Sequence, residues 1–110
     1  MLKYEYLQPL FDSQKSFYRK ARVFKTNHET ILMSYNTVVV LIPCDALEGE
    51  YYLRNCYSAT TLRHIKEFLI QYGGFSAYGL TKKNIEKWAK KLDNIDWEET
   101  ERMVTETIEF

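Results

Sequence analysis

The sequence is poor in cysteine, proline and glycine, and it carries no excess charge of either sign. Its 110 residues include two cysteines, two prolines and four glycines, with 15 basic and 15 acidic side chains. Two cysteines cannot form the disulfide framework of a small secreted domain, so we expect a cytoplasmic protein with reduced thiols. A chain of this length buries enough apolar surface to fold as one domain without a metal or a disulfide. The zero net charge argues against a dominant basic surface for nucleic acid.

Long apolar runs and metal-ligand spacings are also absent. The longest apolar run, Val38 to Ile42, is far too short to cross a membrane, and Met1 to Leu10 lacks the apolar centre of a secretion signal. No CxxC or HxxxH spacing occurs, so we expect no metal and no cofactor. Cys56 and His64 have no third group to orient them as a nucleophile and base, so we predict that the protein is not an enzyme.

What the sequence has in excess is aromatic residues, together with an uneven distribution of charge. There are nine tyrosines, six phenylalanines and two tryptophans. Residues 61–92 carry seven Lys or Arg against two acids, whereas residues 93–110 carry seven acids against Arg102 alone. The third quarter of the chain is therefore basic and its end is acidic.

The clearest element is a helix over Tyr57 to Tyr72. Its apolar residues recur at the spacing of one helical face, Ser58 is an N-cap residue, and Gly73–Gly74 supplies a C-terminal stop. A second helix is predicted from Thr81 to about Leu92. Asp96, with Glu99 three residues later, predicts an acidic third helix that runs to about Ile108.

Three stretches before the first helix have strand character: Ser16–Lys25, Thr30–Pro43 and Tyr51–Tyr57. The order predicts an α+β fold, with a small antiparallel sheet of about three strands packed on one face by two or three C-terminal helices. We expect residues 1–15 to form an extended or loosely docked arm and residues 16–110 to form the domain. The predicted core residues are Val38, Val40, Leu41, Leu62, Ile65, Phe68, Leu69 and Trp88.

Three segments resemble a family of small uncharacterised proteins encoded by bacteriophages and other mobile elements. They are SFYRKA at 16–21, SYNT at 34–37, and YSATT with RHIKEFL at 57–69. The resemblance covers roughly residues 16–74 and implies a genomic context more than a chemistry. Small phage proteins often inhibit host defence, including CRISPR nucleases, so the resemblance implies a host protein as the partner.

Three groups of side chains are candidate contact residues. The N-terminal end of the first helix offers hydroxyls and cations to an anion: Ser58, Thr60, Thr61, Arg63 and Lys66. Helix capping alone is an alternative explanation for the hydroxyls. The second helix has a basic face: Lys82, Lys83, Lys87, Lys90 and Lys91. The third has an acidic face that either imitates a nucleic-acid backbone or, as we favour, neutralises the lysines: Glu98, Glu99, Glu101, Glu106 and Glu109. His64 is predicted to be a structural histidine.

These observations favour a protein that acts by binding. The first hypothesis is a phage or mobile-element accessory protein, monomeric or dimeric, that binds a host protein in the bacterial cytoplasm, such as a CRISPR nuclease or another defence component. The alternative is a nucleic-acid-binding accessory protein that uses basic faces around Arg19–Arg22 and Lys82–Lys91.

Overall fold

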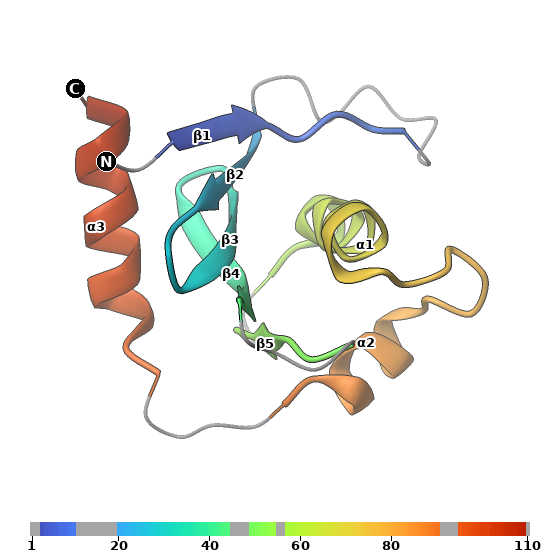
Figure 1. Ribbon diagram of the computed structural model, residues 1–110. Helices are drawn as coiled ribbons and strands as arrows, with labels where there is room; N and C mark the ends of the chain where they lie inside the picture. The colour runs from blue at the N-terminus through green and yellow to red at the C-terminus, as the bar shows by residue number, and fades with distance from the viewer. Residues whose placement is uncertain (1–2, 11–19, 45–48, 55–56, 91–94, 110) are drawn as a thin grey trace.

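The computed structural model describes residues 3–10, 20–44, 49–54, 57–90 and 95–109, and it is an α+β fold (Figure 1). Five antiparallel strands form one sheet in the order β1-β2-β3-β4-β5. The strands are β1 (Lys3–Tyr6), β2 (Ala21–Lys25), β3 (Glu29–Ser34), β4 (Thr37–Pro43) and β5 (Tyr52–Leu53). The helices are α1 (Ala59–Gly73), α2 (Lys82–Trp88) and α3 (Trp97–Glu109).

The sheet has five strands where about three were predicted, and one of the additional strands comes from a hairpin. The predicted strand region Thr30–Pro43 contains both β3 and β4, which are joined at a turn of Tyr35 and Asn36 with Ser34 opposite Thr37. Tyr35 has a positive φ of 57°, a conformation that such turns usually assign to glycine or asparagine. The sequence therefore lacks the usual glycine signal at this turn.

The second additional strand is β1, which lies at one edge of the sheet and pairs with β2. It comes from the segment predicted as an arm, and Leu7, which follows it, is buried in the core. The predicted strand Ser16–Lys25 is represented by β2, and its beginning lies outside the described residues. The predicted strand Tyr51–Tyr57 is represented by the short β5, with residues 55 and 56 also outside the described part.

The apolar run of β4 is continuous because the strand contributes to a core on each face, and a register shift places two consecutive valines on one side. Leu32 pairs with Val40 and Met33 pairs with Val38, which leaves Val39 as the additional residue of a bulge. Val39 and Val40 face the α1 side of the sheet, whereas Val38 faces the other side. Both faces of this strand are therefore buried.

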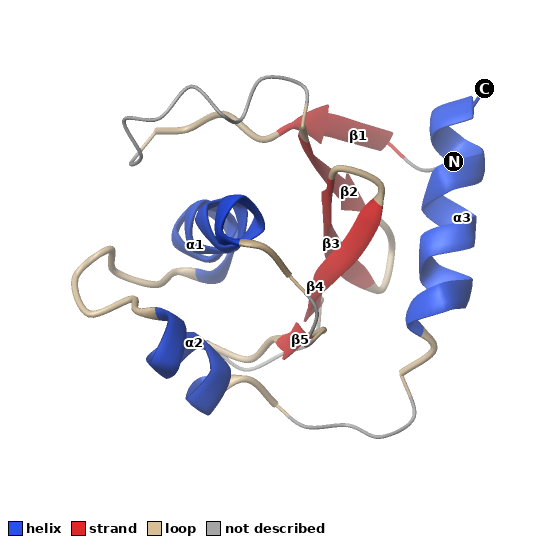
Figure 2. Ribbon diagram, turned by 180° about the vertical axis from the view of Figure 1, so that it is seen from behind, coloured by secondary structure: helices blue, strands red, loops and turns tan. Residues whose placement is uncertain are grey.

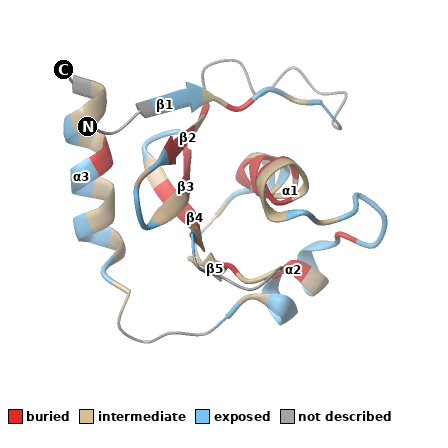
Figure 3. Cartoon of the chain, in the orientation of Figure 1, coloured by how far each residue is buried: buried red, intermediate tan, exposed pale blue. Residues whose placement is uncertain are grey.

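Helices cover both faces of the sheet, and not one face as predicted (Figure 2). The α1-side core consists of fully buried residues from the sheet, α1, α2 and the loops: Leu7, Ala21, Val23, Leu32, Val39, Val40, Tyr51, Ile65, Phe68, Leu69, Leu80 and Ile85. The α3-side core consists of Phe24, Ile31, Met33, Val38, Leu41 and Val104. Figure 3 shows this burial on the strands and α1, with exposed residues on the outer sides of α2 and α3. The helix faces were predictable, but the side of the sheet to which each helix packs was not.

Most of the predicted core residues are buried. Val38, Val40, Leu41, Ile65, Phe68 and Leu69 are all buried as predicted. Leu62 is only half-buried, although it packs against the α1-side core. The prediction for Trp88 is wrong, because α2 ends at this residue and leaves it 44% exposed.

The helix ends follow the capping residues. Ser58 is the N-cap of α1, where its Oγ accepts from the Thr61 N–H, and Gly74 ends the helix in the left-handed conformation, with φ 75°. Thr81 caps α2. Asp96 Oδ1 accepts from the Glu99 N–H at 2.9 Å, which confirms the predicted start of α3.

Candidate functional site

The two motifs SYNT and YSATT–RHIKEFL meet in the structure. Ser34, at the end of β3, places its Oγ 2.9 Å from Thr61 Oγ1 and 2.7 Å from His64 Nδ1. Thr61 and His64 lie three residues apart on α1, so both side chains reach the same strand end. All three residues are buried. We call Ser34, Ser58, Thr61 and His64 the motif junction.

The Ser34 hydroxyl satisfies two buried neighbours at once. It carries one proton and two lone pairs, so it donates to one of Thr61 Oγ1 and His64 Nδ1 and accepts from the other. The tautomer of His64 decides whether Ser34 donates to His64 Nδ1 or accepts from it, and so sets the direction of the whole row of hydrogen bonds. Ser58 Oγ extends the chain by donating to Thr61 Oγ1 at 3.2 Å. Hydrogen bonds in such a chain polarise one another, which strengthens the connection between β3 and α1.

The Ser34–His64 pair has the separation of a nucleophile and its base, but it is closed to a substrate. Ser34 is 2% exposed and His64 is 0% exposed, so a reacting group cannot approach the hydroxyl in this conformation. The junction therefore braces the fold, in agreement with the structural role predicted for His64. Glu67 of α1 is also buried, and its Oε2 accepts from Gln71 Nε2 at 2.6 Å.

The N-terminal end of α1 contains the candidate anion-binding residues, but the structure brings only some of them together. Ser58 and Thr61 are hydrogen-bonded to each other, and their hydroxyls serve the cap and the junction. Thr60 and Lys66 are half-buried and Arg63 is exposed. An anion-binding role for this group stays a prediction.

Tyr35 is a surface feature that the sequence did not reveal as a candidate. The residue is 43% exposed although its backbone adopts a conformation unfavourable for a bulky side chain. Its ring lies 5.8 Å from the His64 ring, and its carbonyl accepts from Arg22 Nη1 at 3.2 Å. The only signal was its place in SYNT, between a buried serine and an exposed asparagine.

A row of three aromatic rings leads from the core to the surface at α2. Tyr51 is fully buried and donates its hydroxyl to the Ile85 carbonyl at 2.5 Å. Phe75 packs edge-on against Tyr51 with centroids 5.4 Å apart, and Trp88 stacks on Phe75 with centroids 6.0 Å apart. Trp88 is thus held on its inner side and open on its outer side. We call Phe75, Trp88 and the neighbouring lysines the α2 face.

The lysines of the α2 face are exposed: Lys82, Lys83, Lys87 and Lys90. Lys82 lies 5.7 Å above the Tyr57 ring, and Lys90 pairs with Glu50 at 3.9 Å. The ion pairs of the described residues include neither Lys83 nor Lys87, which lie one turn apart. Lys91 lies outside the described part of the chain. The loop before α2 also carries Tyr78, which is 95% exposed.

Three tyrosines near α1 and α2 have raised pKa values. Burial raises the pKa of Tyr51 to about 12. Burial and then the hydrogen bond to the Glu5 carboxylate raise the pKa of Tyr72 to about 12. Burial and the hydrogen bond to Glu86 raise the pKa of Tyr57 in the same direction. The two carboxylate contacts tie β1 and α2 to the segment around α1, so these phenols contribute to structure as neutral donors.

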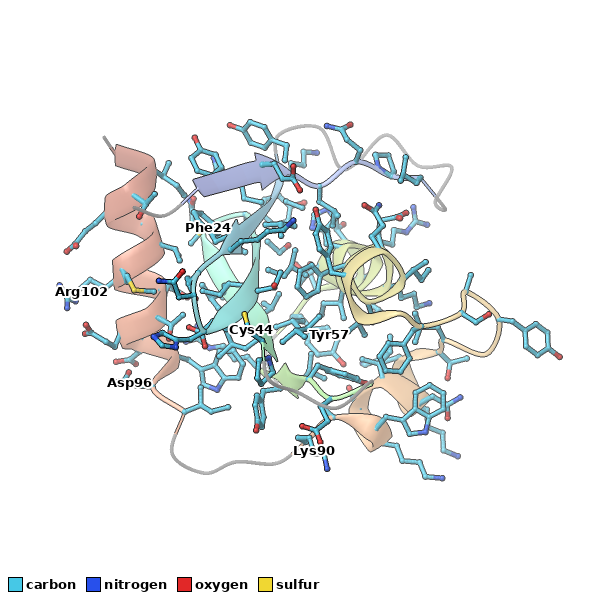
Figure 4. All side chains as sticks on the ribbon, in the orientation of Figure 1. Phe24, Cys44, Tyr57, Lys90, Asp96 and Arg102 are labelled. Atoms are coloured by element: carbon cyan, nitrogen blue, oxygen red, sulfur yellow. The ribbon has the colours of Figure 1, made fainter. Side chains whose placement is uncertain are left out.

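The acidic face of α3 lies on the other side of the sheet from α2 (Figure 1). Figure 4 shows Arg102 on α3 and Asp96 just before it, both away from Lys90. Glu98, Glu99 and Glu106 are exposed, and Glu99 and Glu106 both pair with Arg102. Glu101 is half-buried and pairs with Arg54 at 2.7 Å. Nothing is described for the Glu109 side chain.

This placement does not support the favoured idea that the acids of α3 neutralise the lysines of α2. Among the described residues, no ion pair joins the two helices. The helices pack on opposite faces of the sheet, each with its apolar side against a different core. The charge of Glu99 and Glu106 is instead offset within α3 itself, by Arg102.

The thiols and possible metal ligands form no site in the described part of the chain. Cys44 is exposed as a free thiol, whereas Cys56 lies outside it. No group of three or more His, Cys, Asp or Glu side chains there is arranged to hold a metal ion. None of the described helices has both the length and the apolar character needed to cross a membrane.

The motif junction and the α2 face both lie in the part of the chain that matches a known protein family. Residues 6–91 match a family of unknown function, DUF8033. This span includes β2 to α2 and ends before α3. No curated protein and no solved structure shows a match to the chain. Because the match covers most of its length, the chain belongs to the DUF8033 family.

Proposed function

We propose that the protein acts by binding another macromolecule and performs no chemistry of its own. The buried state of the Ser34–His64 pair supports this proposal, because the best nucleophile–base geometry in the described residues serves as a brace. The hydroxyls of both motifs that form the junction are likewise used inside the fold. Function then depends on exposed side chains that the fold does not require.

The observation that carries the proposal is the exposed tryptophan of the α2 face. Burying one large aromatic side chain at an interface is worth several times more than a surface ion pair. Trp88 is supported by Phe75, so little side-chain freedom is lost when its outer side is covered. The α2 face lies inside the family match, whereas the acidic α3 lies outside it. A function common to the family is therefore better supported at α2 than at α3.

The partner proposed is a protein with an acidic surface. Tryptophan, tyrosine and arginine dominate the energetics of protein interfaces, and lysines at the rim increase the rate of encounter with an acidic patch. The resemblance to phage and mobile-element proteins adds the context: an accessory protein in the bacterial cytoplasm that binds a CRISPR nuclease or another component of host defence.

The second candidate is binding of single-stranded nucleic acid at the same face. A stacked aromatic pair with lysines one turn apart suits a base on the ring and phosphates beside it. The zero net charge and the limited number of lysines make this the weaker candidate. Of the other predicted basic face, Arg19 lies outside the described residues, and Arg22 is directed to the Tyr35 carbonyl at the far end of β3.

The test of the first candidate is protection of a phage in bacteria that carry an active defence system. Expression of the wild-type chain should raise the efficiency of plating, and Trp88→Ala and Lys83→Glu/Lys87→Glu should abolish the effect at equal protein level. Lys20→Glu/Lys25→Glu is the matched control, because it reverses two exposed lysines at β2 and should leave protection unchanged. Protection that survives both α2 variants would remove the α2 face from the proposal.

The second candidate is tested by the fluorescence of Trp88 during titration with oligothymidine. The Trp88→Phe variant is the control, because its tryptophan fluorescence comes from Trp97 alone. A protein-binding function predicts no saturable quenching at low salt. Quenching whose affinity falls steeply as salt rises would instead assign the α2 face to nucleic acid, because phosphate contacts release counterions.

A further inference from the structure

The two edges of the sheet differ in how they are protected (Figure 1). At the β5 edge, the Lys90 N–H donates to the Tyr51 carbonyl at 2.8 Å, and Tyr52 forms a parallel bridge with Lys90. At the other edge, β1 pairs with β2, and no other strand of the described residues pairs with it. The four residues of β1 include no proline and no bulge, which are devices that prevent an edge from pairing with a second chain. The outer edge of β1 is therefore where this sheet can continue.

The hydrogen bonds to β2 show which backbone groups of β1 point outward. The Leu7 N–H donates to the Ala21 carbonyl at 2.9 Å, so the backbone groups of Leu7 face β2. These groups alternate in direction along an antiparallel strand. The backbone groups of Glu5 therefore also face β2, whereas those of Tyr4 and Tyr6 face the open edge. A strand added at this edge has to bond to Tyr4 and Tyr6.

β1 is held in place by contacts that leave its outer edge unused. The Tyr72 hydroxyl donates to the Glu5 carboxylate, and Gln71 Nε2 donates to the Gln8 carbonyl at 2.7 Å. Leu7, directly after the strand, is buried in the α1-side core. Because the strand is already ordered by these contacts, it loses little further conformational freedom when another strand is added.

The charges of β1 select one register for pairing with a second copy of the same strand. Two copies related by a two-fold axis pair antiparallel, and each position of the axis places one residue opposite its own counterpart. An axis at Lys3 or at Glu5 opposes two like charges directly, which is destabilising. An axis at Tyr6 brings neither charge opposite one of the other sign.

An axis at Tyr4 satisfies both the charges and the backbone. It places Lys3 of each copy opposite Glu5 of the other, so two pairs of opposite charge form. It also makes Tyr4 a hydrogen-bonded pair with its counterpart, in agreement with the outward direction of its backbone groups. Lys3 and Glu5 then occupy the non-hydrogen-bonded position, where opposing Cα atoms are only ~4.5 Å apart.

We propose that the protein forms a two-fold dimer through β1, in which the sheets of two copies join as one continuous antiparallel sheet. The occupant of the edge is a second copy because the strand KYEY complements its own charges when it is paired antiparallel. Four residues of strand bury less area than a standard interface, so the association is weak and depends on protein concentration. The α2 face lies near β5, at the opposite edge, so the dimer leaves both copies of that face exposed (Figure 1). The dimer does not depend on the function proposed for the α2 face.

Analytical ultracentrifugation of the full chain over a range of concentrations measures the association, and two charge reversals test its register. Lys3→Glu opposes two carboxylates at both contacts of the dimer, and Glu5→Lys opposes two ammonium groups. Each variant alone should associate about tenfold more weakly than the wild type or worse, because two attractive pairs become repulsive. Tyr72→Phe is the matched control for Glu5→Lys. It removes the same hydrogen bond to β1 and leaves the edge charges unchanged, so its association should equal that of the wild type.

Two combinations should restore the association that each reversal removes. In an equimolar mixture of the two single variants, both carboxylates of one chain meet both ammonium groups of the other, so the mixed dimer should form with the wild-type affinity. The double variant Lys3→Glu/Glu5→Lys exchanges the two charges within one chain and should also associate like the wild type. Amide hydrogen exchange reports the backbone bonds directly: the Tyr4 and Tyr6 N–H groups should become more protected as the protein concentration rises.

Three results would overturn the proposal. The first is a wild-type chain that stays a monomer at every concentration. The second is a dimer whose affinity is unchanged by Lys3→Glu, because the two copies then meet at another surface or in another register. The third is a mixture of the folded single variants that associates no better than either variant alone, because β1 then does not pair with its counterpart through opposite charges.

Discussion

Ser34→Ala tests whether the motif junction holds β3 to α1. The Ser34 hydroxyl is hydrogen-bonded to both Thr61 and His64, at 2.9 and 2.7 Å. Alanine fits the site without a clash but removes this hydrogen-bond partner from Thr61 Oγ1 and from His64 Nδ1. Because the site is buried, the loss of a hydrogen-bond partner there costs about 1–3 kcal/mol.

The expected loss lies near the middle of that range. Thr61 keeps its contact with Ser58, so its hydroxyl can turn and recover part of the cost. His64 Nδ1 loses the partner that Ser34 supplies and meets a methyl group instead. We therefore expect the free energy of unfolding to fall by about 2 kcal/mol, which for a domain of this size lowers the melting temperature by roughly 8 °C.

Urea and thermal unfolding of the wild type and the variant measure this loss directly. Ser76→Ala is the matched control, because Ser76 is exposed and its hydroxyl accepts from the Tyr78 N–H within its own loop. It should change stability by less than about 0.5 kcal/mol. Thr61→Val combined with Ser34→Ala should cost less than the sum of the single variants, with a coupling of about 0.5–3 kcal/mol for groups in one network. A loss below about 0.5 kcal/mol for Ser34→Ala would refute the junction as a brace.

Three further variants test the core, an ionisable phenol and a thiol. Phe68→Ala should cost about 3–5 kcal/mol in urea unfolding, because the ring is fully buried on the inner face of α1. Burial raises the pKa of Tyr51 to about 12 in the folded chain against 10.0 in the unfolded chain, so its stabilising effect is complete below pH 10.0 and declines as the pH rises towards 12. Tyr51→Phe should therefore lose less stability than the wild type between these pH values. Cys44→Ser should leave the melting temperature unchanged, since the thiol is exposed.

The first helix could be read from the sequence because its determinants are local. Ser58 caps the helix, Gly74 ends it, and Phe68 and Leu69 lie on the buried face. These features depend on neighbours within one or two turns, so they can be predicted from the local sequence pattern. The same holds for Asp96 at the start of α3. Local chemistry thus predicted each helix, whatever its position in the fold.

The arrangement of the sheet could not be read in the same way. The turn at Tyr35 has no glycine, and its positive φ is imposed by the pairing of Ser34 with Thr37 and by the Tyr35 N–H bond to the Lys20 carbonyl at 2.6 Å. The second of these contacts joins residues far apart in the chain. The bulge in β4 is a second such feature: it places the neighbouring Val39 and Val40 on the same side of the sheet, so the faces of this strand cannot be assigned by simple alternation.

Trp88 shows why an apolar stripe does not identify core residues at a helix end. Its spacing from Ile85 placed it on the buried face of a longer predicted helix. In the structure α2 ends at this residue, and Phe75 takes the position next to the buried Tyr51. The ring is consequently stacked on one side and exposed on the other. Trp88, which was wrongly predicted to be buried, is thus the exposed aromatic residue of the α2 face.

In the motifs that carry the family resemblance, residues needed for folding can also be distinguished from residues exposed at the surface. Ser34, Thr61 and His64 are explained by the hydrogen bonds that join β3 to α1, so these residue types serve folding whether or not the family shares an activity. Tyr35 stands beside them in an unfavourable backbone conformation, with its ring next to that of His64 and 43% of the residue exposed. Strain of this kind is retained where the surrounding structure or a function requires it. Within the span shared with the family, Tyr35 and Trp88 are accordingly among the exposed residues whose substitution we expect to separate function from folding.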